Sequence, residues 1–378
     1  MDENLRLGRL FGVRIGINWS VLIIFALIVA GLAAGRFPLV APDRSTTAHL
    51  LAGLVAALLF FGSLLAHELS HALVAQRNGI DVEGITLWML GGVAKLEGEA
   101  ATPGAELRIA GVGPLVSLVL GLLFGLLWWV SGGLLGDGLT REVLQWLAII
   151  NVVLAVFNLA PAAPLDGGRI LRALLWWRRG DRTSAAVTAS RAGRLFGFLL
   201  VALGVAELLL VPGFGGLWLV LIGFFIANAA AAEGSYAQVQ AGLSGLRVAD
   251  VMTPSPLVLP QHLNVEQAVD VYLLPNRFSS FPVVSPEGRP LGLVTLQRIK
   301  QVPREQWPVT SIQRVATPLE EVPIATPFEP LLEVLRRVRQ GGESRVLVVH
   351  DGQVVGIVSP TDIARVLDRA PLRSRPSA

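Results

Sequence analysis

The chain has 378 residues, enough for two or three domains, and it is strongly apolar. Hydrophobic residues make up 53% of it and charged residues 16%, whereas soluble domains carry about 25% charged residues. The formal net charge is +3, and no basic stripe interleaved with aromatic residues indicates a nucleic-acid partner. The absence of cysteine excludes disulfides, thiolate metal sites and thiol nucleophiles, so any metal site must use His, Asp and Glu.

Six apolar segments are long enough to cross a bilayer, which requires about 20 residues. They are residues 17–35, 48–75, 107–131, 143–162, 193–211 and 215–233. The first is longer than the apolar region of a secretory signal, so we interpret it as an uncleaved span. The sequence therefore predicts a polytopic α-helical membrane protein embedded in a lipid bilayer, with about six transmembrane helices.

Lysine and arginine are enriched in loops on the cytoplasmic side of membrane proteins. The N-terminal tail and the loops after the second and fourth segments carry Arg6, Arg9, Arg14, Arg77, Lys95, Arg108, Arg169, Arg172, Arg178, Arg179, Arg182, Arg191 and Arg194. The opposite loops carry only Arg36, Arg44 and Arg141. We therefore expect both termini to lie in the cytoplasm, with the spans in the plasma membrane.

Two of the five histidines form the motif His67-Glu68-Leu69-Ser70-His71, within the second apolar segment. Side chains four residues apart share one face of a helix, so both imidazoles can bind one Zn²⁺ ion. Glu68 would then reach a water molecule at the metal and accept its proton. The alternative is a pair of histidines that only hydrogen-bond within a bundle. Ionisable residues in membrane helices are costly, however, and this favours a functional site.

A catalytic zinc ion of this kind needs a third protein ligand and an open coordination position. The best candidate is Asp166, in the segment NLAPAAPLDGG at residues 158–168. The prolines of this segment break the fourth helix, and Gly167 and Gly168 allow close approach of the backbone. The alternative for Asp166 is a helix cap at the membrane border.

HELSH in the second span and NLAPAAPLDGG after the fourth together resemble the site-2 protease family of intramembrane zinc metalloproteases, over roughly residues 1–235. The resemblance implies that the substrates are single-pass transmembrane proteins. It also implies that Asn158 contacts the substrate or stabilises the oxyanion, although Asn158 could instead make an interhelical hydrogen bond. The family pattern implies catalytic and metal-binding roles for four residues: Glu68 as the catalytic residue, and His67, His71 and Asp166 as the ligands.

Residues 84–98 are too short to span a membrane, and two β-prone runs flank Gly91 and Gly92, which predicts a hairpin. A substrate must leave its helical conformation to be hydrolysed, because the carbonyl groups of a spanning helix are hydrogen-bonded. We expect a strand edge of this hairpin, near the two glycines, to hold the extended substrate by β-augmentation. The alternative is an ordinary cytoplasmic loop.

The last part of the chain repeats itself, since residues 282–302 align with residues 346–366. Each unit is predicted to run helix, strand, turn, strand and helix, which suits two small α/β modules better than a solenoid. The repeat resembles a tandem pair of CBS domains over about residues 246–368, opened by the sequence VADVMT at 248–253.

CBS pairs often bind adenosine nucleotides, and the family's contact pattern is Gly-x-x-Ser/Thr-x-x-Asp. The second unit has the whole pattern and ends in Ser359 and Asp362, whereas the first has Thr295 but Arg298 in place of the acid. Arg298 could instead meet a phosphate group. The resemblance implies adenine nucleotide contacts at Thr295, Ser359 and Asp362. The alternative is a dimerisation or folding module without a ligand.

These patterns predict a protease domain followed by an α/β tail. The expected boundaries are a transmembrane metalloprotease domain at 1–235, a linker at 236–245, CBS domain 1 at 246–302, CBS domain 2 at 303–368 and a tail at 369–378. We expect the CBS pair to regulate the protease, and a homodimer could form through it.

Two other classes of protein fit parts of the pattern. A channel or transporter with a CBS tail would have ionisable groups scattered over several spans, whereas here they converge on one motif and one aspartate. A non-catalytic membrane scaffold would not need all four chemical residues. Serine and aspartyl intramembrane proteases are disfavoured, because the chain has no Gly-x-Ser-x-Gly motif and no second well-placed aspartate.

Overall fold

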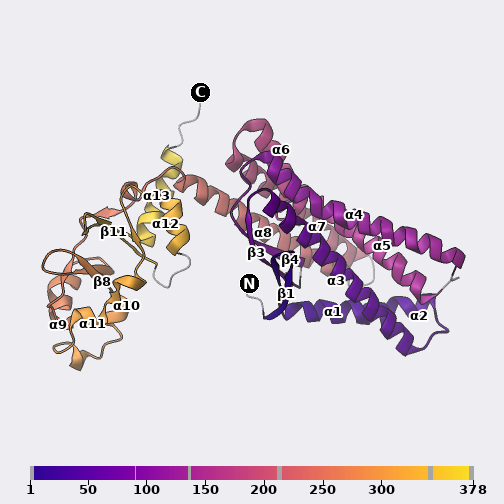
Figure 1. Cartoon of the computed structure of the whole chain (residues 1–378), viewed down its shortest axis with the longest axis horizontal. Coiled ribbons are helices and arrows are strands. Elements are labelled where there is room, and N and C mark those ends of the chain that lie inside the picture. The colour runs from indigo at the N-terminus through magenta and orange to yellow at the C-terminus, as the bar shows by residue number, and fades with distance from the viewer. Residues whose placement is uncertain (1–3, 90, 135–137, 211–214, 339–343, 374–378) are drawn as a thin grey trace. The chain divides into compact units, whose positions relative to one another are not determined.

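The computed structural model describes residues 4–89, 91–134, 138–210, 215–338 and 344–373. The chain divides into two compact units, Met1–Ala237 and Gln238–Ala378. The first unit consists of long helices and one small sheet, and the second is mixed α/β (Figure 1). This confirms the predicted fold class.

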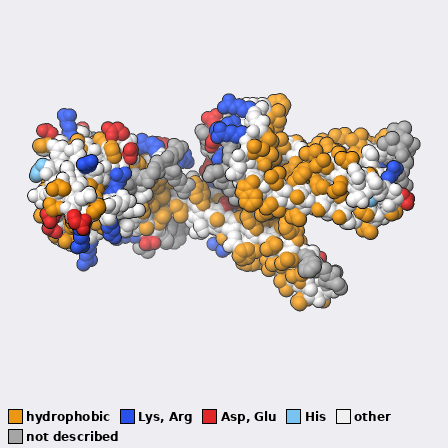
Figure 2. All heavy atoms as spheres, turned by 90° about the horizontal axis from the view of Figure 1, so that it is seen from below, with side chains coloured by type: hydrophobic (Ala, Val, Ile, Leu, Met, Phe, Trp, Pro, Cys, Tyr) orange, Lys and Arg blue, Asp and Glu red, His pale blue; other side chains and the backbone are white. Residues whose placement is uncertain are grey.

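Six helical segments of the described chain are long and apolar enough to cross a membrane, as predicted. Hydrophobic side chains cover most of the visible face of this unit in Figure 2, which suits a surrounding of lipid. The spans are formed by α1 (Ser20–Ala30) with η1 (Gly31–Arg36) and α2 (Phe37–Val40), α3 (Thr46–Arg77), α4 (Pro103–Leu134), α5 (Leu139–Asn158), α7 (Arg182–Leu210) and α8 (Gly215–Leu243).

The helix ends follow from local sequence. The Ser45 hydroxyl accepts a hydrogen bond from the Ala48 amide and caps α3. Helix α5 ends at Asn158, before the expected residue 162, because Pro161 cannot continue the helix. After the turn at residues 159–165 comes a further helix, α6 (Asp166–Arg179), in a stretch that the sequence predicts only as a loop. Helix α7 begins well before the expected residue 193, since its polar first turns remain helical outside the apolar part.

A four-stranded sheet packs against α3. Its order is β1 (Leu5–Leu10), β2 (Val13–Ile17), β3 (Asp81–Trp88) and β4 (Gly91–Glu97), with β2 and β3 parallel and the other pairs antiparallel. Apolar side chains of the sheet and of α3 form one core cluster: Val13, Ile85 and Leu87 pack with Leu64, Leu69 and Ala72. The sheet is thereby fixed over the part of α3 that carries the histidine motif.

Two expectations for this region are wrong in detail. Residues 5–17 form two strands, where the sequence predicts a polar tail and the start of a span, and the first helix begins only at Ser20. Alternation at Val13, Ile15 and Ile17 favours a strand once β3 is available as its partner. The hairpin at 84–98 is present, but its turn lies before Gly91, which pairs with Trp88 as the first residue of β4.

The second unit contains two modules with the predicted helix–strand–strand–helix order. The first has α9 (Val265–Ala268), η3 (Val269–Leu273), β7 (Ser280–Val284), β8 (Pro290–Thr295) and α10 (Leu296–Ile299). The second has α12 (Leu331–Val338), β11 (Val346–His350), β12 (Gln353–Val358) and α13 (Pro360–Arg373). Short elements precede the first module: η2 (Val248–Asp250), β5 (Thr253–Pro254) and β6 (Leu259–Pro260). Others connect the two modules: η4 (Arg304–Gln306), α11 (Ile312–Val315), β9 (Thr317–Pro318), η5 (Leu319–Glu321) and β10 (Ile324–Ala325).

The two modules exchange edge strands. The sheets have the orders β6-β7-β8-β9 and β10-β11-β12-β5. Strand β5, which precedes the first module, therefore pairs with β12 of the second, and β9 pairs with β8 of the first. This exchange brings Thr253 beside residues that follow it by more than 100 positions.

Candidate metal centre

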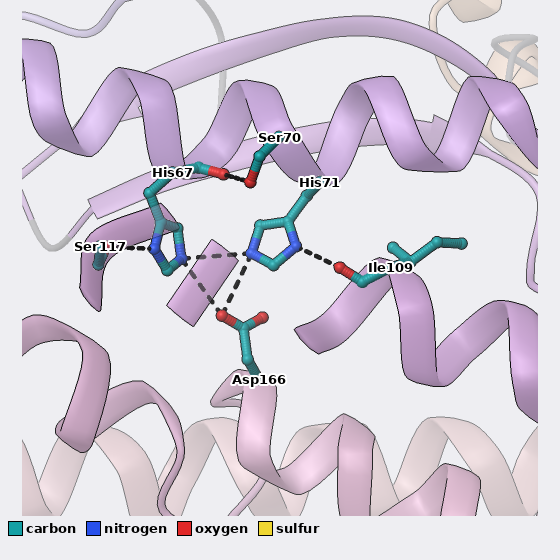
Figure 3. A network of polar contacts seen from close by, with 6 residues as sticks. All are labelled: His67, Ser70, His71, Ile109, Ser117 and Asp166. Atoms are coloured by element: carbon teal, nitrogen blue, oxygen red, sulfur yellow. Dashed lines mark hydrogen bonds and ion pairs between the residues drawn. The ribbon is translucent and has the colours of Figure 1, made fainter. Parts of the chain in front are cut away.

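The histidine motif lies in the second half of α3, where both imidazole rings are buried. His67 and His71 are 2% and 6% exposed. Their spacing of four residues places the two Nε2 atoms 3.2 Å apart, as the helix geometry predicts (Figure 3).

The carboxylate of Asp166 closes a triangle with these nitrogens. Its Oδ2 atom lies 3.2 Å from the Nε2 atoms of both His67 and His71 (Figure 3). Tetrahedral zinc ligands at 2.0–2.1 Å from the metal lie about 3.3 Å from one another. The three atoms therefore fit one face of a zinc coordination tetrahedron.

The outer nitrogens of both rings have partners that fix the rings. His71 Nδ1 lies 2.6 Å from the backbone oxygen of Ile109, and His67 Nδ1 lies 2.8 Å from the hydroxyl of Ser117. A carbonyl oxygen can only accept, so His71 donates from Nδ1 and presents a free electron pair at Nε2. Such outer partners hold metal-binding histidines in their orientation.

Helix α4 contacts the histidine pair directly through Gly113. A Cβ atom at this position would lie 2.2 Å from His71 Nε2 and 2.7 Å from His67 Nε2. Only glycine leaves room for the imidazole nitrogens here. Sequence reasoning missed Gly113 and Ser117, although two small residues spaced by four on a membrane helix signal close helix packing.

The turn between α5 and α6 places Asp166 next to the two histidines. Cβ atoms at Gly167 and Gly168 would lie 2.2 Å from the Ala160 oxygen and 2.3 Å from the Ala163 nitrogen, so the close backbone approach predicted for these glycines is present. Burial would raise the pKa of the Asp166 carboxyl, but its hydrogen bonds with His67 and His71 outweigh burial and hold this pKa below the ordinary value.

A buried ion network supports α6. Arg172 contacts Glu106 of α4 through two nitrogens, and its Nη1 atom lies 3.2 Å from Glu233 of α8. The Glu106 side chain is 1% exposed. A buried carboxylate requires such a partner, and the network links α6, which begins with Asp166, to α4 and α8.

Glu68 faces the hairpin. Its side chain lies against the backbone of Gly92 in β4. A Cβ atom at residue 92 would lie 2.2 Å from Glu68 Cγ, so only glycine permits this approach of β4. Strand β4 is also the edge strand of its sheet. The structure thus brings the predicted edge strand next to the predicted base.

Asn158 is the last residue of α5, eight positions before Asp166. Its side chain is half-buried and makes no hydrogen bond within the described part of the chain. Asn151, one to two turns earlier, is fully buried and donates to the Leu147 oxygen of its own helix.

In the second unit, Ser359 and Asp362 line a pocket of about 290 Å³. Asp362 is 4% exposed and accepts hydrogen bonds from the hydroxyls of Ser359 and Thr253. The sequence analysis did not identify Thr253, which the strand exchange brings next to Asp362. Thr295 does not line this pocket, because it lies at the end of β8, where its hydroxyl caps α10.

Comparisons with known proteins agree with these observations. Residues 55–140 and 132–204 match the model of peptidase family M50, and residues 248–305 and 312–369 match the CBS domain. Rip3 of Mycobacterium tuberculosis, named as a zinc metalloprotease, is 43% identical over 97% of this chain and 94% of its own.

Matches from one archaeon are also found. Zinc metalloprotease MJ0392 of Methanocaldococcus jannaschii is 28% identical over 97% of both chains. The solved structure of a site-2 protease from the same organism matches with a TM-score of 0.44 and 27% identity, over 61% of this chain and 94% of that one. The match to the family model and the 43% identity to Rip3 show that the chain belongs to peptidase family M50, the site-2 protease family, as a multi-pass membrane zinc metalloendopeptidase with a C-terminal pair of CBS domains.

Proposed function

We propose that this enzyme hydrolyses peptide bonds of single-pass membrane proteins, in or beside the bilayer, at a zinc ion held by His67, His71 and Asp166. The observation that carries the proposal is the triangle of ligand atoms with two 3.2 Å edges from Asp166 Oδ2 and a third between the imidazole nitrogens. Zinc in such a site supplies Lewis-acid activation of water and of the scissile carbonyl.

Glu68 is the general base of this proposal. Its carboxylate, next to His67 in sequence, accepts the proton of the attacking water and later delivers it to the leaving amine. The close approach of Gly92 keeps the Glu68 side chain beside the edge strand β4. Asn158, whose side chain is unbonded within the described chain, contacts the substrate or donates to its developing oxyanion.

The free edge of β4 holds the substrate as an added strand. Backbone groups of an edge strand can bind an extended peptide of any sequence. Gly91 and Gly92 stand at the start of β4, and Gly92 lies against Glu68, so a peptide paired there would present its carbonyl groups next to the general base. Proline substitutions along β4 should reduce cleavage and leave the zinc content unchanged; unchanged cleavage would exclude this role.

The decisive experiment compares wild type, Glu68→Gln and Asp166→Ala, purified in detergent. We expect Glu68→Gln to retain zinc and lose cleavage of a single-pass substrate, and Asp166→Ala to lose both. Zinc-free wild-type protein, or a Glu68→Gln variant that cleaves as well as wild type, would refute the mechanism.

We propose further that the CBS pair regulates the protease from the cytoplasm, which is where the arginine-rich loops lead us to expect both termini. The pocket beside Asp362 is a candidate site for an adenosine nucleotide, and Arg277 and Arg365 line it as potential phosphate partners. Helix α8 supplies a covalent link, because it begins as a membrane span and its last residue, Leu243, is in the core of the second unit. The CBS pair could also mediate homodimerisation. Nucleotide titration of cleavage, with oligomeric state measured in parallel, tests both roles.

A further inference from the structure

An apolar pocket of about 400 Å³ lies in the first unit, beside the turn that carries Asp166. Its walls come from α1, α8, the tip of the β3–β4 hairpin and the turn before α6. Pockets of this volume, lined by apolar side chains, are typical binding sites for organic groups. The zinc mechanism proposed above does not use it.

Three residues that line the pocket are neighbours in sequence of residues in the proposed site. Leu165 is bonded to Asp166, Phe157 to Asn158, and Met89 stands two residues before Gly91 in the hairpin. Since neighbouring Cα atoms are about 3.8 Å apart, the pocket begins one or two residues from a proposed metal ligand, the proposed oxyanion donor and the substrate edge.

Contacts between the elements hold this space open. The Met89 amide donates to the Ser20 hydroxyl at the start of α1, at 3.1 Å. The Trp88 ring packs against Phe225 of α8, with ring centroids 5.9 Å apart. The hairpin that carries the substrate edge is thereby tied to both helices of the pocket wall.

The mouth of the pocket is bordered by exposed apolar residues of two candidate membrane spans. Ile23 of α1 and Leu221 of α8 are 42% and 53% exposed, and the face of this unit that Figure 2 shows is largely hydrophobic. A peptide that leaves the bilayer to pair with β4 would pass this mouth. Successive side chains of a strand point to opposite faces, so a paired peptide can direct one side chain into the pocket.

We propose that this pocket is a specificity subsite that accepts one large apolar side chain of the substrate, close to the scissile bond. The inference rests on the proposed function and names the substrate class: proteins with a leucine- or phenylalanine-sized residue at one position near the cut. Discrimination by an apolar pocket reaches about 10–200-fold per methylene group, so a preference of at least about 10-fold over alanine is expected. The competing occupant is a lipid acyl chain.

The test uses the full-length protein and a cleaved single-pass substrate. Each residue within about four positions of the cut is changed in turn to Ala, Leu and Phe, and kcat/KM is measured. The pocket is narrowed by Leu221→Trp, and Leu217→Trp is the matched control, because Leu217 lies one turn earlier on α8 and does not line the pocket.

We expect wild type and Leu217→Trp to prefer Phe or Leu at one position. Leu221→Trp should lower kcat/KM for that large residue by about 10-fold or more and leave the Ala substrate within about twofold, because an apolar pocket discriminates by size. An equal loss of kcat/KM for all substrates would assign the pocket to lipid. Unchanged substrate preferences in Leu221→Trp would mean that the pocket has no role in specificity. Either result overturns the subsite. Wild-type protein without zinc-dependent cleavage would refute the proposed function itself.

Discussion

A single methyl group at Gly113 should disrupt the zinc centre. In Gly113→Ala the new Cβ atom would lie 2.2 Å from His71 Nε2 and 2.7 Å from His67 Nε2, far inside ordinary contact near 3.4 Å. Relief requires the two nitrogens to retreat by about 1.2 and 0.7 Å, or α4 to shift. The rings cannot rotate freely, because their outer nitrogens are bound to Ile109 and Ser117.

The size of the effect follows from these displacements. A misplacement of about 1 Å in a catalytic centre can lower activity by about 100-fold. We expect a loss of at least this size in zinc affinity, measured by chelator competition on the purified protein, and in kcat/KM for a membrane substrate.

Gly111→Ala is the matched control, with the same substitution two residues earlier on the same helix. A Cβ atom at residue 111 would meet nothing within 4 Å. Because alanine is favoured over glycine within helices by about 0.5–1 kcal/mol, this variant should be at least as stable as wild type and bind zinc normally. Equal zinc affinity in the Gly113→Ala and Gly111→Ala variants would refute the reasoning.

Two further variants probe the surroundings of the metal centre, and a third probes the pocket in the second unit. Ser117→Ala removes the partner of His67 Nδ1 and should lower zinc affinity by about 10–100-fold in the same competition; an unchanged affinity would show that Ser117 does not orient the ring. Arg172→Met leaves Glu106 buried without its cation and should lower the free energy of unfolding by about 3–5 kcal/mol, unless denaturation shows the helices repacking. Asp362→Asn should weaken adenosine nucleotide binding by about 10–100-fold, and equal binding would exclude this pocket.

Arg182→Met controls for the loss of an arginine near the same helix. Arg182 pairs with Glu99, but both side chains are more exposed than the Arg172–Glu106 pair. Surface pairs contribute about 0–1 kcal/mol, so Arg182→Met should hardly change the free energy of unfolding. A similar loss in both arginine variants would show that burial of Glu106 is not the cause.

Local sequence predicts those parts of the site that depend on spacing within one helix. The i, i+4 relation of His67 and His71 needs no tertiary information, and apolar length alone predicts six spans. Asp166 is separated by about a hundred residues, and its approach to the histidines depends on Gly167 and Gly168 packing on a turn that no local pattern describes.

Other features arise only when distant segments meet. The strands at residues 5–17 form because β3 offers an edge, so their short polar sequence alone resembles a tail. Thr253 reaches Asp362 only through the exchange of β5 into the second CBS sheet. Gly91 and Gly92 resemble a turn in sequence, but Gly92 is required by the approach of β4 to Glu68.

The two close glycine contacts at the centre have a common physical reason. Backbone from α4 and from β4 must approach a helix that already carries three large polar side chains, and any Cβ at Gly113 or Gly92 would enter the space of those side chains. A wider separation would admit lipid or water around the imidazoles, where unsatisfied polar groups in an apolar medium are costly. Glycine at these two positions therefore lets the protein enclose a polar centre within an apolar bundle. In the proposed mechanism an incoming peptide pairs with the edge of β4 and supplies its own hydrogen bonds there.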